Sequence, residues 1–367
     1  MLKKTIRRLG ALAMVLAMAV SVFAVNASAT EGVEATYTQI GRFTKKVTTD
    51  GHTFAPNTTF AYTVNGVAAD GEATVKTSSG NTTIKYYAGK TGDVVFTDTA
   101  FAPGADATSI KEEYTGYGAI NVKDGAYTKP GIYRYTVTEE NGGYEGITYD
   151  LATRYLYVYV INKEDGTGVE VSGFILTKEI TTTVDKEVVT IETKTDEWVN
   201  DYGKDNNTTH DVKFVKVVTG NMGDKVNDAF DFDVKVDGQS GEKYKVVYAS
   251  TADVDATTTF VTSGTVATIT GIKHTGYIQI YGLTKGDKYT VAEHDYSGNG
   301  YTTTYSDSYD PADGGTTTED GTVVTVTNDK DASTPGGVIM TIAPYALMLV
   351  VAGAFAVVFL TRRNRAE

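Results

Sequence analysis

Apolar and polar residues alternate one by one in short runs along most of this chain. Clear runs of this kind occupy residues 60–64, 133–137, 156–160, 230–234 and 289–291. Because successive side chains of a strand point to opposite faces, each run predicts a β-strand with one buried face. Asn-Gly and Asp-Gly turn signals lie between the runs, and the region between the two chain ends has no convincing 3.6-residue apolar period. We therefore expect an all-β protein built from antiparallel β-sandwiches.

A polar stretch without aromatic residues, residues 203–211, predicts a linker between two domains. The flanking parts, residues 30–202 and 212–332, share one signature. Each part contains a lysine, then a glutamate, then an asparagine, and each of these residues is in phase with the apolar positions of its strand. This repetition predicts two tandem immunoglobulin-like β-sandwich domains with similar interiors.

The shared polar residues form two triads. The first triad is Lys45, Glu139 and Asn200. The second triad is Lys216, Glu293 and Asn328. Since side chains two positions apart share a face of a strand, all six groups are expected to point into the domain cores.

Buried lysine, glutamate and asparagine side chains can react with one another. Desolvation lowers the pKa of a lysine and raises that of a carboxyl group, so both can become neutral. A neutral amine is a nucleophile, and a protonated carboxyl can polarise the asparagine amide and pass a proton to the leaving ammonia. The product is a Lys–Asn isopeptide bond between the first and last strands of a domain, which stabilises it by closing a long loop.

Neighbouring residues offer alternatives to these assignments. Lys46 and Glu140 adjoin Lys45 and Glu139, but alternation places them on the outer face. Lys213 is out of phase with Lys216 unless the strand contains a bulge. In a second interpretation, the polar groups lie at strand ends on the surface.

Composition limits the other kinds of chemistry. The chain has no cysteine, which excludes disulfides and thiol nucleophiles, and its formal net charge of −13 disfavours nucleic acid as a partner. The four histidines are scattered without metal-ligand spacing, so no metal site and no cofactor are expected. The only chemistry that the sequence predicts is single-turnover and intramolecular, so the protein is not expected to be an enzyme in the ordinary sense.

Both ends of the chain carry membrane-directed segments. Residues 1–29 combine basic residues, an apolar run and an Ala-Ser-Ala site, which is typical of a secretory signal peptide. Near the other end, residues 338–360 are mostly apolar and uncharged, and Arg362, Arg363 and Arg365 follow. Roughly 20 apolar residues can cross a bilayer as a helix, so this run predicts a transmembrane segment with a cytoplasmic tail.

The last segment, residues 333–367, resembles the cell-wall sorting signal of Gram-positive surface proteins. Thr334, Pro335, Gly336 and Gly337 precede the apolar run, where such signals carry Leu-Pro-x-Thr-Gly or the shorter Val-Pro-Thr-Gly. Pro335 and Gly337 match the shorter form and Thr334 and Gly336 do not; the resemblance favours cleavage between the two glycines. The alternative is a plain single-pass membrane anchor.

Taken together, four features resemble the streptococcal T-antigen (FctA-like) major pilin family. They are the two triads, the segment Pro56-Asn-Thr-Thr-Phe60, the strand Gly131–Glu139 and the sorting-like terminus. The resemblance implies that Lys45 bonds to Asn200 with Glu139 as catalyst, and that Lys216 bonds to Asn328 with Glu293 as catalyst. It also implies that a pilin sortase joins the cleaved terminus to a lysine of the next subunit. By position in the family this lysine is Lys194, with Lys186 and Lys178 as alternatives.

The resulting hypothesis is a structural subunit of a covalent pilus, exported and anchored to the cell wall after transient membrane anchoring. Its expected partners are identical subunits, a pilin sortase, a cell-wall sortase, peptidoglycan and a tip adhesin. The alternative function is a monomeric wall-anchored adhesin or minor pilin of the same fold that binds a host or matrix ligand.

Overall fold

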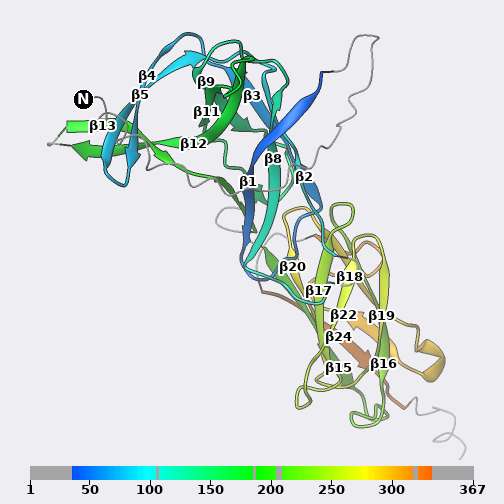
Figure 1. Cartoon of the computed structure of the whole chain (residues 1–367). Helices are drawn as coiled ribbons and strands as arrows, with labels where there is room; N and C mark the ends of the chain where they lie inside the picture. Colours follow the sequence, from blue (N-terminus) through cyan, green and yellow to red (C-terminus); the bar gives the residue numbers. More distant parts are fainter. Residues whose placement is uncertain (1–34, 105–106, 185–186, 204–208, 317–320, 333–367) are drawn as a thin grey trace, which may run out of the picture.

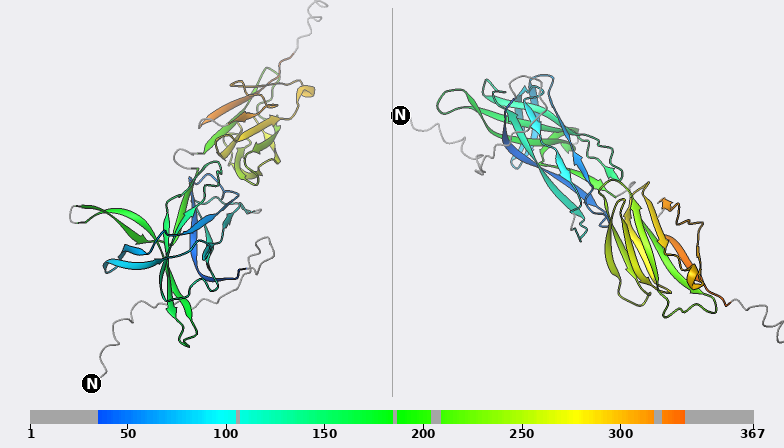
Figure 2. Two further views of the ribbon diagram at one scale, coloured as in Figure 1. Left: turned by 90° about the horizontal axis from the view of Figure 1, so that it is seen from above. Right: turned by 90° about the vertical axis from the view of Figure 1, so that its right-hand side faces the viewer.

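The computed structural model describes residues 35–332 except 105–106, 185–186, 204–208 and 317–320. Two β-domains follow one another along an elongated molecule (Figures 1 and 2). The first contains β1 to β14 and the second β15 to β24. The all-β prediction is confirmed. A short 3-10 helix, η2 (Ser297–Asn299), interrupts the second domain.

In the first domain, the described strands form two main sheets. One has the order β10-β14-β1-β8-β6, with β10 (Ile147–Thr148), β14 (Glu197–Tyr202), β1 (Tyr37–Thr49), β8 (Glu113–Lys123) and β6 (Val94–Phe96). The other has the order β11-β12-β13-β4-β5-β9-β3, with β11 (Arg154–Asn162), β12 (Val169–Val184), β13 (Glu187–Lys194), β4 (Gly71–Thr77), β5 (Gly80–Ala88), β9 (Gly131–Glu139) and β3 (Tyr62–Gly66). Strand β9 also pairs with β11. A small ribbon joins β2 (Thr58–Phe60) to β7 (Thr99–Phe101).

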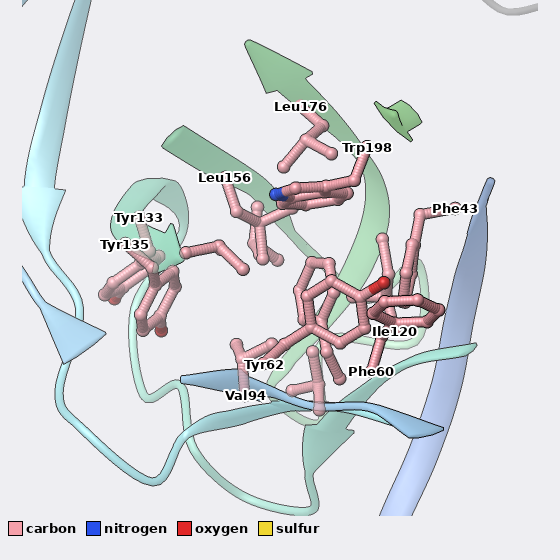
Figure 3. Close-up of a cluster of buried hydrophobic side chains, with 14 of the residues drawn as sticks. Phe43, Phe60, Tyr62, Val94, Ile120, Tyr133, Tyr135, Leu156, Leu176 and Trp198 are labelled. Atoms are coloured by element: carbon pink, nitrogen blue, oxygen red, sulfur yellow. The ribbon is translucent and has the colours of Figure 1, made fainter. Parts of the chain in front are cut away.

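Aromatic side chains dominate the core between these sheets (Figure 3). Trp198 is fully buried and makes edge contacts with Phe43, Tyr62 and Phe96 at ring-centroid distances of 5.3, 5.2 and 5.9 Å. These neighbours come from β1, β3 and β6, so the tryptophan of β14 joins both sheets. Large buried rings with edge-to-face geometry contribute strongly to core stability.

The predicted run at residues 60–64 divides into two strands. Strand β2 ends at Phe60 and pairs with β7, whereas β3 begins at Tyr62 and pairs with β9. The run thus changes its partner strand at Ala61, whose carbonyl accepts the N–H of Glu140 at 2.9 Å. This bond lies next to Glu139 and helps to place the end of β9.

The described strands of the second domain form a six-stranded and a four-stranded sheet. The larger has the order β18-β17-β20-β15-β24-β22, with β18 (Thr257–Thr262), β17 (Lys243–Ala249), β20 (Tyr277–Leu283), β15 (His210–Thr219), β24 (Thr322–Asp329) and β22 (Thr302–Tyr305). The smaller has the order β19-β16-β21-β23, with β19 (Val266–Ile272), β16 (Phe230–Asp237), β21 (Lys288–Glu293) and β23 (Gly315–Thr316). Valine, isoleucine and phenylalanine side chains of both sheets fill the core between them.

In both domains the first strand lies beside the last strand and runs parallel to it. Strand β1 pairs with β14, with Lys45 opposite Trp198 and Val47 opposite Asn200. Strand β15 pairs with β24, with Lys216 opposite Val326 and Val218 opposite Asn328. Parallel neighbours require a long connection, and here that connection is nearly the whole domain.

The two domains meet through a buried polar junction. Glu242, just before β17, accepts hydrogen bonds from the hydroxyls of Tyr144 (2.9 Å) and Tyr202 (2.8 Å) of the first domain. Lys243 donates to the carbonyl of Ala107 at 2.7 Å. The junction is therefore built from side chains of both domains.

The predicted signal peptide and the segment 333–367 lie outside the described residues. Among the residues that are described, no helix is long and apolar enough to span a membrane. In the same part of the chain, no cluster of His, Asp and Glu side chains could hold a metal ion.

Candidate functional site

The structure brings the first triad together in the core of the first domain. Lys45 donates to Glu139 Oε2 at 2.6 Å, and Asn200 Nδ2 donates to Glu139 Oε1 at 2.5 Å. Lys45 and Asn200 are fully buried, and Glu139 is 3% exposed. One carboxyl group thus bridges the amine and the amide, although the three residues lie far apart in the sequence.

Strand alternation explains how these side chains reach the core. Phe43, Lys45 and Val47 face inward on β1, and the intervening residues face outward. Trp198, Asn200 and Tyr202 do the same on β14. Because β1 and β14 are parallel neighbours, Lys45 and Asn200 share the inner face of one sheet. Glu139 ends β9 of the opposite sheet and reaches across the core.

Burial shifts the pKa values of Lys45 and Glu139 toward the neutral forms of both groups. Desolvation lowers the pKa of Lys45 to about 8, although the Glu139 carboxylate opposes this. Desolvation also raises the pKa of Glu139, against the stabilising effect of Lys45. The two shifts favour transfer of a proton from the ammonium to the carboxyl, which yields a neutral amine and a neutral acid. The ring of Phe60, 4.5 Å from Lys45 Nζ, forms part of the apolar wall.

The second triad has the same arrangement. Lys216 of β15 hydrogen-bonds to Glu293 Oε2, and Asn328 Nδ2 of β24 donates to Glu293 Oε1 at 2.5 Å. The side chains of Lys216 and Glu293 are 0% and 1% exposed. Desolvation lowers the pKa of Lys216 to about 8. The ring centroid of Phe230 lies 4.1 Å from Lys216 Nζ, so an aromatic ring faces the lysine in this domain too.

The alternative residues lie outside these sites. Lys46 forms ion pairs with Glu197 at 3.1 Å and Glu113 at 3.7 Å, on the outer face of its sheet. Glu140 is exposed and bonds to Thr63. Lys213 stacks over the ring of Tyr277 at 4.3 Å. Hence β15 keeps its alternation through Lys213 and Lys216 without a bulge between them.

Two residues that the sequence did not single out complete the first site. The backbone N–H of Asp150 donates to Asn200 Oδ1 at 2.8 Å. Arg154, 2% exposed, hydrogen-bonds to the Asp150 carboxylate. A signal was present, because Arg154 is in phase with the inward-facing Leu156 and Val158 of β11. An arginine at such a position needs a buried partner.

The surface lysines occupy a different part of the first domain. Lys194 ends β13 and Lys178 lies on β12, and both are exposed. Their strands are hydrogen-bonded neighbours, with Lys178 opposite Thr193 and Lys194 opposite Thr177. Lys186 and the predicted sorting residues Thr334, Pro335, Gly336 and Gly337 lie outside the described residues.

The arrangement in each core permits an aminolysis of asparagine. The lysine nitrogen attacks Cγ, and the new C–N bond forms as the Cγ–Nδ2 bond breaks. The glutamic acid transfers a proton to the leaving nitrogen, so the products are one secondary amide and one ammonia. Each site holds a single amine and a single amide, so the reaction occurs once per domain.

Comparison with known proteins agrees with this architecture. Residues 41–203 match the family FctA, described as a Spy0128-like isopeptide containing domain. Residues 210–330 match a domain of unknown function, DUF7601. A pilin of Streptococcus pyogenes serotype M1 is 29% identical over 259 residues, which cover 65% of this chain and 69% of that protein.

Solved structures that are similar to this chain include those of pilus proteins. The major pilin from Streptococcus pyogenes is 19% identical with a TM-score of 0.47, over 80% of this chain and 99% of that one. The major pilin T-13 from Streptococcus pyogenes is 21% identical with a TM-score of 0.48, over 81% of this chain and 100% of that one. On the sequence matches, residues 41–203 form an FctA-type, Spy0128-like isopeptide containing domain, and the chain is similar to a streptococcal pilin over 65% of its length.

Proposed function

We propose that each domain of this protein closes an autocatalytic isopeptide bond, Lys45 to Asn200 with Glu139 as catalyst, and Lys216 to Asn328 with Glu293 as catalyst. The observation that carries this proposal is the recurrence of one buried arrangement in two cores. In both, a single carboxyl group contacts a lysine amine and an asparagine amide on adjacent parallel strands. A buried ion pair alone is weak evidence for stability, but a third reactive partner at the same carboxyl favours bond formation.

The protein is a structural subunit of a pilus, and we propose that sortases assemble it into a covalent fibre. A pilin sortase cleaves the segment Thr334–Gly337 and joins it to Lys194 of an identical subunit, or to Lys178 or Lys186. A cell-wall sortase attaches the fibre to peptidoglycan, and a tip adhesin completes it. In this account the segment 338–360 anchors the chain in the membrane before sorting.

The positions of the two bonds suit such a fibre. With Lys194 as the linkage residue, tension enters at the end of β13 and leaves after β24, so it passes through the second domain. There the Lys216–Asn328 bond would carry the load directly from the first strand to the last. Without it, the chain between the two residues, which are 112 positions apart (328 − 216), could extend by roughly 370–400 Å.

The intact mass of recombinant residues 30–331 tests the bonds. We expect a deficit of two ammonia masses, and a deficit of one in both Glu139→Ala and Glu293→Ala. Glu140→Ala is the matched control for the first substitution, because Glu140 adjoins Glu139 and is exposed. The full calculated mass in a folded wild-type sample would remove the isopeptide proposal.

Co-expression with a pilin sortase tests polymerisation. A ladder of covalent multimers that disappears in Lys194→Arg supports the shaft subunit and the linkage residue together. A ladder that persists in Lys194→Arg but not in Lys178→Arg or Lys186→Arg reassigns the lysine. Wild-type protein that remains monomeric while carrying both internal bonds favours the alternative function, a wall-anchored adhesin or minor pilin.

A further inference from the structure

The carbonyl side of the two asparagines differs between the domains. In the first domain, Asn200 Oδ1 accepts the backbone N–H of Asp150 at 2.8 Å. In the second, Asn328 Oδ1 is buried and has no hydrogen-bond partner among the described residues. The two sites therefore have the same arrangement of lysine amine and glutamate carboxyl. They differ in the group that faces the asparagine amide oxygen.

The Asp150 N–H is held in place by a buried arginine. Arg154 Nη2 donates to Asp150 Oδ2 and, at 3.3 Å, to the carbonyl of Glu197 on β14. Arg154 Nη1 donates at 2.9 Å to the carbonyl of Ala152. The guanidinium also lies 5.1 Å from the Trp198 ring. Arg154 thus ties the loop that carries Asp150 to the strand that carries Asn200.

We propose that the Asp150 N–H is an oxyanion donor for isopeptide formation in the first domain, and that Arg154 is the positioning residue that holds it there. The inference rests on the proposed bond between Lys45 and Asn200. When Lys45 attacks Cγ, electrons move onto Oδ1, and a donor already at hydrogen-bonding distance stabilises the negative charge. The charge disappears when the carbonyl re-forms and ammonia leaves.

Charge near the site is compatible with this role. The Arg154 cation and the Asp150 carboxylate neutralise each other, so the pair adds little net field at the amine. The guanidinium makes no hydrogen bond to Lys45, Glu139 or Asn200 within the described part of the chain. Its effect on the reaction is through the loop and not through proton transfer.

The magnitude follows from comparable sites. Removing one oxyanion donor slows acyl transfer by roughly 10²- to 10³-fold. Loss of the Arg154 hydrogen bonds leaves the Asp150 N–H present but free to move. We therefore expect Arg154→Gln to slow the formation of the Lys45–Asn200 bond by at least about tenfold. Arg154→Lys keeps a cation but not the forked guanidinium donor, so its rate of bond formation is expected to lie between those of wild type and Arg154→Gln.

The test is a time course of bond formation in the full chain made by cell-free synthesis. Samples are quenched in denaturant and digested, and mass spectrometry measures the Lys45–Asn200 and Lys216–Asn328 cross-linked peptides. The rate ratio of the first bond to the second is an internal standard within each chain. Arg134→Gln is the matched control, because Arg134 is a largely buried arginine of the same domain that pairs with Glu192 at 2.5 Å and lies on the opposite face of β9 from Glu139.

We expect the ratio to fall at least about tenfold in Arg154→Gln, partly in Arg154→Lys, and less than about twofold in Arg134→Gln. If Trp198 fluorescence shows that Arg154→Gln does not fold, the same rate ratio is measured in Asp150→Asn. This substitution keeps the backbone N–H at position 150 and removes the charge pair with Arg154. An unchanged ratio, or an equal fall in Arg134→Gln, overturns this inference alone. Wild-type chain without a Lys45–Asn200 peptide overturns the proposed function as well.

Discussion

Replacing Glu139 by glutamine should prevent the first bond while leaving the shape of the core nearly intact. Glutamine has the size of glutamate and can still contact Lys45 and Asn200, but it has no acidic proton to transfer. Desolvation lowers the pKa of Lys45 to about 8 and the Glu139 carboxylate opposes this, so loss of the carboxylate favours the neutral amine further. The substitution therefore separates the covalent bond from the packing around it.

The size of the effect follows from the loop that the bond closes. Glu139 is 94 residues from Lys45 and 61 from Asn200, so the loop spans 155 residues (94 + 61). In the chain-entropy description, closing a loop of this length stabilises the folded state by about 5 kcal/mol. For a domain of this size, each kcal/mol corresponds to about 2–4 °C, so the first domain should melt about 10–20 °C lower.

The single tryptophan makes the assay specific for the first domain. Trp198 is the only tryptophan in the chain and is fully buried beside the first triad. Its fluorescence on heating reports the first domain, while calorimetry on the same sample also follows the second. Glu140→Gln changes the exposed neighbour of Glu139, and it should leave the free energy of unfolding of each domain within about 0.5 kcal/mol of wild type.

Two results would refute this reasoning. A folded Glu139→Gln protein that still lacks both ammonia masses would show that Glu139 does not catalyse the reaction. A protein that regains one ammonia mass but melts within about 3 °C of wild type would show that loop closure does not stabilise the domain as calculated.

Three further predictions concern the second domain, the junction and the core. Glu293→Gln should restore one ammonia mass and lower the calorimetric transition of the second domain by a similar free energy, about 5 kcal/mol, without moving the Trp198 transition; a shift of the Trp198 transition instead would contradict it. At the junction, desolvation and the nearby Glu242 raise the pKa of Asp287 to about 6. The Asp287 carboxyl ionises at a lower pH in the unfolded chain than in the folded protein, so this group lowers the free energy of unfolding by up to about 3 kcal/mol as pH rises from 4 to 6.5. Asp287→Asn should remove this loss of stability between about pH 4 and 6.5, measured by denaturant titration, and an unchanged loss would count against the prediction. Trp198→Ala should destabilise the first domain by about 3–5 kcal/mol, measured by calorimetry because the substitution removes the fluorophore, and a loss under about 1 kcal/mol would mean that the core collapses around the gap.

The sequence alone was sufficient for the all-β fold class and for the inward direction of the triads. Alternation has a period of two whatever the partner strand, so Lys45 in phase with Phe43 and Val47 had to share their face. The same local rule placed Lys46 and Glu140 outside. The rule also held across Ala61, where Phe60 and Tyr62 are both buried, but it did not show that the run at residues 60–64 changes its partner strand there.

Contacts between distant segments decided which strands are neighbours and which groups meet at each site. Which strands are neighbours depends on the closing of two sheets around one core, and only this closing puts Glu139 between Lys45 and Asn200. The Asp150 N–H and the Glu242 junction were invisible to alternation, because a loop backbone group and an inter-domain side chain have no periodic signal. Sequence periodicity thus determined which way each side chain points, and the tertiary structure determined what it meets there, because direction is a local property of a strand and proximity is not.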